Sequence, residues 1–414
     1  MMTMLLDECK KLKMASKKLA IANSKEKNQA LREVIISIKE DTDYILEENA
    51  KDVKTARESG MKESLIDRLM LNKQRIDGII ESIENIIEAR DPVWRSNDVW
   101  TMENGLVISK MTVPIGVIGI IYESRPNVTV DAFALTLKSG NCVLLRGSSN
   151  SLNSNRALVR AIKKGLKNST ISEDVIGFID DEDRQIVREM LTCNEYIDLI
   201  IPRGGKNLIN MVVQNATVPT IETGEGNCHT YVDSSADLKK AVDIIENAKV
   251  QRPGVCNACE TLLVHEDIAK DLLPMVVDRI GKLVEFRGCQ RTQEIIDVKP
   301  ATEEDWAEEY LDYILAIKIV KSTREAIDHI NKYGTQHSEA ILTEDITSAK
   351  LFRREVDAAA VYVNASTRFT DGGEFGFGGE MGISTQKMHA RGPMGLNELV
   401  TVKYTIAGDG HIRG

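Results

Sequence analysis

The first part of the chain alternates apolar and polar positions with the period of an amphipathic helix. Across residues 1 to 95, which are rich in Glu, Lys, Ile and Leu, apolar side chains recur every three or four positions, as in 30–39 and 76–87. A stripe of this spacing lies on one face of a helix and is buried against a neighbour. We predict a helical N-terminal region.

The pattern then changes to an alternation with a period of two. Residues 98–114 alternate around Asn104-Gly105, a pair that favours the tight turn of a β-hairpin. We predict a projecting two-stranded arm over 98–114. The stretch 399–404 is also strand-like, and it follows a glycine-rich segment that begins at Thr370.

From residue 113 to 224, short apolar runs alternate with helical patterns, which is typical of βαβ units in a parallel sheet. The predicted strands are 116–121, 142–145, 175–179, 197–201 and 217–221. The helices predicted between them are 128–138, 155–166, 184–192 and 206–213. A second α/β stretch covers 236–363, with strands near 261–264, 314–317, 340–342 and 359–363.

Composition narrows the class of protein. The 414 residues allow two or three domains, and 42% hydrophobic with 28% charged residues is typical of soluble globular proteins. Without a cationic leader or a run of 18 uncharged apolar residues, we expect neither secretion nor membrane spanning. A net charge of −10 argues against a nucleic-acid surface. Seven scattered cysteines favour reduced thiols in a cytoplasmic enzyme over a disulfide framework.

One cysteine is placed as a nucleophile would be. Cys256 follows the Pro253-Gly254 turn, lies four positions after Arg252 and precedes the apolar run 261–264. A nearby guanidinium and the backbone amides of a turn would stabilise a thiolate and an oxyanion. The alternative is a buried and inert cysteine, because free Cys is among the most buried residue types.

A carboxylate lies upstream of this cysteine. Glu222 is in a glycine-containing turn at the end of a predicted strand, 34 residues before Cys256, and a predicted helix over 236–248 separates the two. This order would bring a base and a nucleophile into one cleft. The rival interpretation is a redox or zinc half-site at Cys256-x-x-Cys259, for which Cys228-His229 is the one nearby second pair.

Three arginines lie in loop motifs that contain Gly or Pro, namely Arg125, Arg252 and Arg391. An acidic protein that binds an anionic substrate must gather arginines locally, and guanidinium groups bind phosphate and carboxylate in a bidentate manner. Each arginine taken alone is equally well explained as a solvated loop residue.

Taken together, Glu222-Thr-Gly224, the helix and Cys256 resemble the aldehyde dehydrogenase superfamily, whose members carry a Glu-x-Gly motif, a helix and then the catalytic Cys at about this separation. Further segments resemble the members that reduce an acyl phosphate, in the order 114–128, 140–147, 201–205, 221–229, 251–258, 333–340, 363–373 and 389–395. The resemblance implies two three-layer α/β/α domains with a small β oligomerisation arm.

The resemblance also implies a reaction. Cys256 would attack the acyl carbon of L-glutamyl 5-phosphate and expel phosphate, giving a thioester that hydride from NADPH reduces to L-glutamate 5-semialdehyde, the second step of proline biosynthesis from glutamate. Arg125, Arg252 and Arg391 would bind the anionic groups of the substrate. Further polar contacts would come from the second domain, from His337, Ser338 and Asn364.

One departure from ordinary aldehyde dehydrogenases bears on the reaction. Ser124 stands where those enzymes carry an Asn that donates to the oxyanion, so the oxyanion hole would rest on the backbone N–H groups of Cys256 and Asn257. Glu222 would either help to deprotonate Cys256 or act as a structural acceptor for backbone amides. A hydrolytic aldehyde dehydrogenase is the alternative enzyme, against which Ser124 and the three arginines count.

The cofactor site has no Gly-x-Gly-x-x-Gly fingerprint, and the superfamily binds its dinucleotide without one. The resemblance implies that Arg146, followed by Gly147 and Ser148, lies near the adenosine ribose. A guanidinium beside hydroxyls suits a 2′-phosphate and favours NADPH, although an arginine that caps a strand is an equal explanation. The resemblance also implies that Glu309 contacts the nicotinamide ribose. Arg203, Gly204 and Gly205 open a helix and would contact the pyrophosphate. The turn is expected to require the two glycines.

These expectations give a domain plan. We predict a helical region and dinucleotide-binding domain over 1–224, a catalytic domain over 225–385 and a tail over 386–414 that returns to the cofactor domain and to an oligomer contact. The arm and the tail predict a homo-oligomer. Association with a glutamate kinase follows only from the logic of an unstable acyl phosphate, and no metal is expected.

Overall fold

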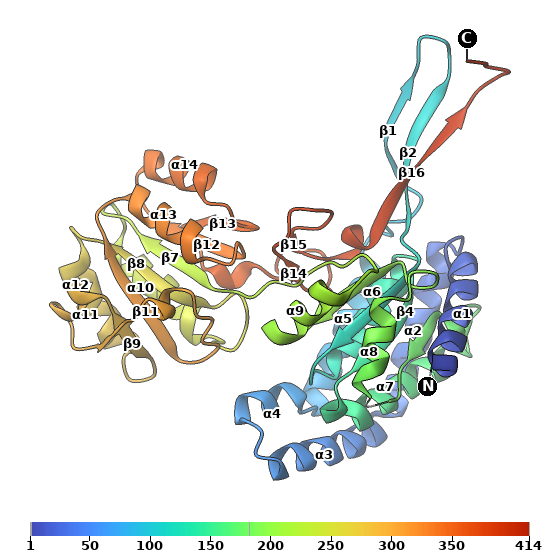
Figure 1. Ribbon diagram of the computed structural model, residues 1–414, viewed down its shortest axis with the longest axis horizontal. Helices are drawn as coiled ribbons and strands as arrows, with labels where there is room; N and C mark the ends of the chain where they lie inside the picture. Colours follow the sequence, from blue (N-terminus) through green and yellow to red (C-terminus); the bar gives the residue numbers. More distant parts are fainter. Residues whose placement is uncertain (1, 182, 414) are drawn as a thin grey trace. The chain divides into compact units, whose positions relative to one another are not determined.

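The computed structural model describes residues 2–181 and 183–413 and divides into two compact units (Figure 1). The first unit comprises the described residues up to Thr223, together with Gly376–Gly382 and those from Met394 onward. The second unit comprises Gly224–Phe375 and Ile383–Pro393. The chain therefore leaves the second unit more than once before it ends in the first.

Five helices open the first unit, as predicted, and they are α1 (Met2–Leu19), α2 (Ser24–Glu40), α3 (Thr42–Glu58), α4 (Glu63–Leu69) and α5 (Lys73–Glu88). The α2 helix begins with a capping box, in which Asn23 accepts from the Glu26 N–H and the Glu26 carboxylate accepts from the Asn23 N–H. Every fully buried side chain of α5 is an isoleucine at helical spacing. These apolar stripes hold the helices against the rest of the unit.

A four-stranded parallel sheet forms the centre of the first unit, in the order β5-β4-β3-β6. Its strands are β3 (Val117–Tyr122), β4 (Cys142–Gly147), β5 (Ile176–Phe178) and β6 (Leu199–Arg203). The helices that alternate with the strands confirm the predicted βαβ pattern, and they are α6 (Asn127–Lys138), α7 (Leu152–Leu166), α8 (Arg184–Leu191) and α9 (Lys206–Asn215). Two 3₁₀ turns, η1 (Ser149–Ser151) and η2 (Glu173–Val175), complete the connections.

The strand predicted over 217–221 is wrong. The segment makes a single bridge, between Ile200 and Thr220, and no ladder. Pro219 explains the difference, because it has no N–H to donate and cannot continue a row of strand hydrogen bonds.

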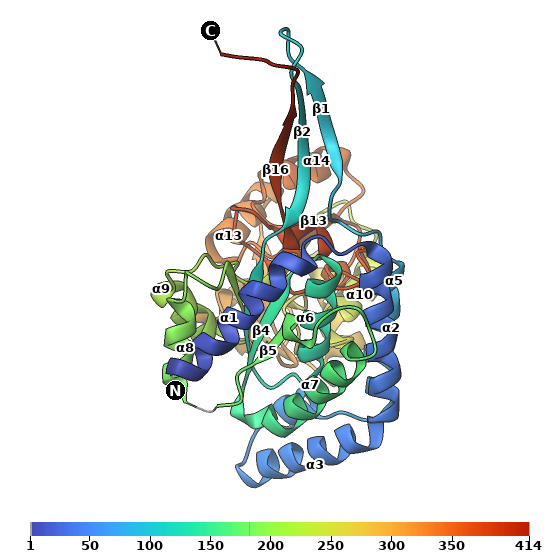
Figure 2. The same cartoon turned by 90° about the vertical axis from the view of Figure 1, so that its right-hand side faces the viewer.

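The predicted arm is confirmed, and the tail completes it. The strands β1 (Ser96–Thr101) and β2 (Val107–Pro114) form a hairpin whose Gly105 has a φ of +92°, a value that favours glycine. The last strand, β16 (Val400–Ala407), pairs with β2 along its whole length (Figures 1 and 2). The three-stranded sheet leaves apolar side chains exposed on β16, including Tyr404 and Ile406.

The second unit is built on a seven-stranded parallel sheet, in the order β10-β9-β11-β8-β7-β12-β13. The strands are β7 (Cys228–Val232), β8 (Cys259–His265), β9 (Glu285–Gly288), β10 (Lys299–Pro300), β11 (Ile314–Val320), β12 (Ser338–Leu342) and β13 (Ala360–Val363). The four strands predicted for this region are confirmed as β8, β11, β12 and β13. The pattern did not predict β7, which lies near the centre of the sheet.

Helices cover both faces of the second sheet. The helices are α10 (Leu238–Val250), α11 (Ala269–Ile280), α12 (Gln290–Gln293), α13 (Thr323–Tyr333) and α14 (Ile346–Glu355). Along β8, Leu262 and Val264 join the core under α10 and α11, whereas Leu263 joins the core under α13 and α14. Because successive side chains of a strand point to opposite faces, these two cores identify a three-layer unit.

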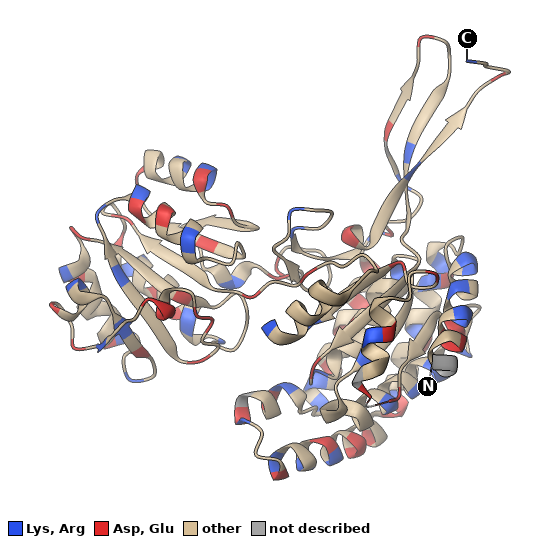
Figure 3. Ribbon diagram, viewed as in Figure 1, with Lys and Arg blue, Asp and Glu red and all other residues tan. Residues whose placement is uncertain are grey.

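Short elements complete the chain, namely η3 (Glu304–Trp306), η4 (Thr367–Phe369), β14 (Ile383–Ser384), β15 (Gly392–Pro393) and η5 (Leu396–Leu399). Charged residues lie mainly on helices and loops, and the central strands of both sheets carry few (Figure 3). Within residues 2–181 and 183–413, no helix has the length and apolar character needed to cross a membrane.

Candidate active site

The predicted nucleophile lies at the amino edge of the second sheet. Cys256 is half-buried in the turn that joins α10 to β8. The turn therefore leads into the strand β8 and not into a helix. The backbone of Gly226, just before β7, packs directly against the Cys256 carbonyl group, and a Cβ atom added to Gly226 would overlap that carbonyl.

Cys228, the first residue of β7, also contacts the nucleophile's backbone. Its thiol donates to the Cys256 carbonyl oxygen over 3.1 Å, and its Sγ lies 3.7 Å from His337 Nδ1. Burial raises the pKa of the Cys228 thiol well above its ordinary value, so this thiol stays protonated. The pattern of residues did not single out Gly226 or Cys228, although both lie in the segment 221–229 that carries the resemblance.

His337, just before β12, and Ser338, its first residue, support Cys228. His337 Nδ1 lies 2.8 Å from Ser338 Oγ, which in turn donates to Thr370 Oγ1 over 2.7 Å. Burial lowers the pKa of His337 to about 4, so the imidazole is neutral near pH 7. These two residues contact Cys228 and Thr370, and they reach the nucleophile's loop through Cys228.

Asn257 is fixed by the segment around η4. Its side-chain amide donates to the Thr370 carbonyl oxygen over 2.8 Å, and its own carbonyl oxygen accepts from Thr367 Oγ1 over 2.7 Å. The Arg368 guanidinium donates to Asn257 Oδ1 and, over 2.9 Å, to Gln251 Oε1. Sequence reasoning missed Arg368, whose only signal was its place in the segment 363–373.

The turn after Cys256 is held from behind by a buried ion pair. The register of β7 against β8 shifts at Cys228, so that Glu260 is the extra residue on β8. Such a bulge redirects a side chain. The Glu260 carboxylate lies 2.5 Å from Lys249 Nζ, and both side chains are fully buried. The pair joins the end of α10 to the start of β8, on either side of the nucleophile's turn.

The remaining predicted residues of the second unit lie at different edges of its sheet. Glu309 is on the amino side, where its carboxylate accepts from the Gly226 N–H over 2.8 Å. Arg391 donates to Asp357 over 2.7 Å just before β13. Asn364 follows β13, and its side-chain amide both donates to and accepts from the backbone of Thr343. Asn364 is therefore at the carboxyl edge, opposite Cys256, and the structure does not bring these two together.

The predicted residues of the first unit lie at the carboxyl edge of its own sheet. Arg125 follows β3, Arg146 to Ser148 end β4, and Arg203 to Gly205 end β6. The chain moves from β3 outward to β4 and β5 and then returns to place β6 on the other side of β3. In open parallel sheets a crevice for ligands forms at such a reversal, outside the carboxyl ends of the strands.

The glycines at this crevice are explained by close approach. Gly204 lies against the Glu123 side chain, since an added Cβ would lie 2.6 Å from the Glu123 carboxyl carbon and would have to displace it. Gly205 donates its N–H to Glu123 Oε2 over 2.9 Å, and an added Cβ would make only an ordinary contact with that oxygen. Neither glycine has a positive φ. Our reason for both glycines was wrong, because the turn itself does not require them.

Arg146 and Ser148 each make a hydrogen bond within their own loop. Arg146 Nη1 donates to the Gly147 carbonyl oxygen over 3.0 Å, and Ser148 Oγ accepts from the Asn150 N–H over 3.2 Å to cap η1. A Cβ added to Gly147 would overlap Asn155. Two arginines, together with Gly147 and Gly204, at which an added side chain would have to displace a neighbour, fit an anionic dinucleotide at this edge.

Glu222 and Cys256 belong to different units. Glu222 is half-buried and lies just before Thr223, whose hydroxyl donates to the Pro202 carbonyl oxygen over 2.7 Å. The predicted pairing of Glu222 with Cys256 stays a prediction. For the rival zinc site, the described part of the chain contains no group of three or more His, Cys, Asp or Glu residues placed to hold a metal ion.

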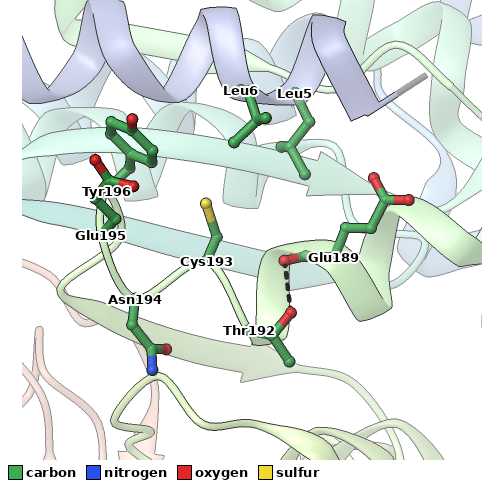
Figure 4. Close-up of a pocket in the computed structure, with 8 residues that line it drawn as sticks. All are labelled: Leu5, Leu6, Glu189, Thr192, Cys193, Asn194, Glu195 and Tyr196. Carbon is green, nitrogen blue, oxygen red and sulfur yellow. Dashed lines mark hydrogen bonds between the residues drawn. The ribbon is translucent and has the colours of Figure 1, made fainter.

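A separate pocket of about 260 Å³ lies in the first unit (Figure 4). Leu5 and Leu6 of α1 line one side, and Cys193 and its neighbours before β6 line the other. Because this segment enters β6, the pocket is at the amino edge of the first sheet. It is therefore distinct from the crevice at the carboxyl edge.

Comparisons with known proteins agree with this geometry. The model of the aldehyde dehydrogenase family matches residues 67–314 and 294–405. The γ-glutamyl phosphate reductase of Alkaliphilus metalliredigens is 71% identical over 100% of both chains. The crystal structure of γ-glutamyl phosphate reductase from Thermotoga maritima is 57% identical, covers 99% of this chain and 100% of that chain, and has a TM-score of 0.96. An acetylating aldehyde dehydrogenase from Geobacillus thermoglucosidasius, 16% identical with a TM-score of 0.74 over 100% and 98% of the two chains, shares the fold.

Proposed function

The chain belongs to the aldehyde dehydrogenase family, and from that premise we propose that it reduces L-glutamyl 5-phosphate to L-glutamate 5-semialdehyde with release of phosphate. This reaction is the second step of proline biosynthesis from glutamate. The observation that carries the proposal is the likeness, over the whole chain, to proteins named γ-glutamyl phosphate reductase.

Cys256 is the proposed nucleophile. Its thiolate attacks the γ-acyl carbon, the bond from that carbon to the phosphate oxygen breaks, and phosphate departs with the bonding electrons. The neighbouring thiols are poor candidates, because burial raises the pKa of Cys228 well above its ordinary value and that of Cys259 to about 11. Cys256, in contrast, is only half-buried in an irregular turn.

The oxyanion that forms on the acyl group is assigned to the backbone N–H groups of Cys256 and Asn257. Hydrogen bonds to Thr367, Arg368 and Thr370 fix the Asn257 peptide and side chain, so these donors need no rearrangement during the reaction. The reduced nicotinamide, when bound, supplies the hydride that converts the thioester to the aldehyde. Glu222 then has two proposed roles, as a base towards Cys256 or as a structural acceptor.

The anionic groups of the substrate are assigned to the arginines. Arg252 is exposed four residues before Cys256 and is the proposed phosphate contact. Arg391 shares its charge with Asp357, so it suits the more distant α-carboxylate, with Arg125 as the contact from the first unit. His337 and Ser338 contribute by positioning Cys228.

NADPH is the proposed cofactor. The residues that would hold it are Arg146, Gly147 and Ser148 at the 2′-phosphate, Arg203, Gly204 and Gly205 at the pyrophosphate, and Glu309 at the nicotinamide ribose. The crevice at the reversal of strand order and the close approach at Gly147 and Gly204 support this assignment.

We further propose a cytoplasmic homo-oligomer that forms through the arm. The exposed apolar residues of β16, an edge strand, support a sheet that continues into a second copy of the chain. Association with a glutamate kinase stays a prediction from the instability of the acyl phosphate.

The reverse reaction tests the proposal. Glutamate 5-semialdehyde and NADP⁺ are incubated with and without inorganic phosphate, and formation of reduced nicotinamide is followed, with Cys256→Ala as the control. We expect turnover only when both phosphate and Cys256 are present. Equal turnover without phosphate would identify a hydrolytic aldehyde dehydrogenase and remove the arginine assignments. Repeating the assay with NAD⁺ measures the cofactor preference.

A further inference from the structure

We propose that Arg368 is a positioning residue of the active site, whose guanidinium clamps the two ends of the Cys256 loop and supplies positive charge that favours the Cys256 thiolate. The inference rests on the proposed function in that it takes Cys256 as the nucleophile. It concerns a residue whose type and place in the sequence gave no reason to single it out.

The clamp is visible in the hydrogen bonds of the guanidinium. Gln251 caps the end of α10 and Asn257 closes the turn before β8, so the two lie on either side of Cys256. Arg368 donates through Nε to Gln251 Oε1 over 2.9 Å and through Nη1 to Asn257 Oδ1. One planar group therefore joins both ends of the loop that carries the thiol.

The segment that carries Arg368 is itself well anchored. The Arg368 N–H donates to Ser366 Oγ over 3.2 Å, and Thr367 Oγ1 donates to the Asn257 carbonyl oxygen over 2.7 Å. Ser366 and Thr367 are both buried. Because the segment that carries Arg368 is fixed, its guanidinium restrains the Cys256 loop.

The charge of Arg368 is available to the nucleophile. Both hydrogen-bond acceptors above are neutral carboxamides, so neither of these hydrogen bonds neutralises the positive charge. Burial, followed by the nearby charge of Arg252, lowers the pKa of Arg368, whereas Cys256 and Asp371 act in the opposite direction. An arginine stays protonated under these influences, and a cation close to a thiol favours the thiolate.

Two cations lie near the Cys256 loop, because the charge of Arg368 interacts with both Cys256 and Arg252. From β7, Cys256 faces Cys228, which burial keeps protonated, and behind that thiol lies the neutral His337, just before β12. Glu309 approaches through Gly226, and Asp371 follows η4. Removing the charge of Arg368 therefore takes away one of these two cations and leaves Arg252, which is exposed to solvent.

The test measures the alkylation of Cys256 by iodoacetamide as a function of pH in the full-length protein, without substrate or nicotinamide. Cys256→Ala gives the background from the other thiols. The variants are Arg368→Gln and Arg368→Met, which remove the charge, and Arg368→Lys, which keeps the charge but not the planar fork. Arg353→Gln, an exposed arginine on α14, is the matched control.

We expect the midpoint of the pH profile to rise by about one pH unit in Arg368→Gln and Arg368→Met, which lowers the alkylation rate near pH 7 about tenfold. Arg368→Lys should retain most of the wild-type midpoint and still lose turnover, because one ammonium group cannot hold both Gln251 and Asn257. Midpoints equal to that of Arg353→Gln in both charge-removing variants would overturn the inference.

The two proposals fail separately. If the reverse reaction shows no dependence on phosphate and the alkylation midpoint still moves, the substrate assignment falls and the role of Arg368 stands. If turnover depends on phosphate while the alkylation midpoint stays fixed, the role of Arg368 falls and the substrate assignment stands.

Discussion

The candidate cofactor residues of the first unit and the candidate nucleophile of the second unit lie at opposite edges of their parallel sheets. In the first unit the candidate residues follow the strands, at the carboxyl edge, on loops whose charged side chains reach solvent. In the second unit Cys256, Gly226 and Cys228 precede or begin the strands, at the amino edge, where a buried hydrogen-bond network fixes them. The first edge is suited to admit a flexible dinucleotide, and the second is suited to hold one thiol in one position.

This difference predicts where each unit tolerates change. The Glu123 side chain at the first edge is exposed to solvent, so it can swing aside at little cost. Backbone atoms at the second edge cannot, because each contacts another buried backbone or side-chain group. The following substitutions compare the two units directly.

The largest effect is expected from the buried ion pair behind Cys256. Lys249→Met leaves the fully buried Glu260 carboxylate without its partner and should lower the free energy of unfolding by about 3 to 5 kcal/mol. In the first unit, Lys13 and Asp198 form a pair over 2.7 Å with 33% and 28% of the side chains exposed, so Lys13→Met should cost about 1 kcal/mol at most. Urea unfolding followed by circular dichroism measures both, and equal losses would contradict the comparison.

A second pair of substitutions adds one methyl group to each edge. Gly226→Ala must displace the Cys256 carbonyl, and a shift of about 1 Å at a nucleophile can cost about 100-fold in rate. Gly204→Ala meets only the end of the exposed Glu123 side chain, which can rotate away, so we expect less than about a threefold change in the KM for NADP⁺.

Steady-state kinetics of the reverse reaction measure these effects. Gly78→Ala, on α5 with open space around its Cα, is the control and should leave the rate unchanged. A Gly226→Ala enzyme with normal kcat would show that the nucleophile's backbone is not confined.

The smallest effect is expected when one of two buried thiols is replaced. Burial raises the pKa of both Cys228 and Cys142 of β4. Cys228→Ala removes a donor to the Cys256 carbonyl and should lower kcat about tenfold, as expected for the loss of about 1.4 kcal/mol of positioning. Cys142→Ala should lower the melting temperature and leave kcat unaltered. If both variants affect only stability, Cys228 is a packing residue.

The local patterns in the sequence were sufficient for much of the fold. Asn104-Gly105 marked the hairpin, and the alternation of apolar runs with helical periods marked β3 to β6, because turn chemistry and periodicity are local properties. They were not sufficient at 217–221, where one proline outweighed the apolar run, or at β7, whose residues Cys228 to Val232 begin directly after a glycine turn.

The candidate site was likewise predicted from the sequence only in part. Cys256 was predicted from its turn, and Asn257 from its place beside it. Gly226 and Arg368 were missed, because their importance comes from contact with residues 30 and more than 100 positions away, which depends on the register of β7 against β8 and on the path of the chain after β13. Gly204 was chosen for a turn that does not need it, since a neighbouring carboxylate is what excludes its side chain.

The pairing of β16 with β2 joins two strands that are synthesised far apart in time. Roughly 290 residues separate Pro114 from its partner Val400, so the hairpin emerges from the ribosome long before the strand that covers its edge. At about 5 to 20 residues per second, the edge of β2 stays open for about 15 to 60 s in every nascent chain. Crowded polysomes would place many such edges near one another during that interval, and Lys110, the one charged residue of β2, opposes their pairing.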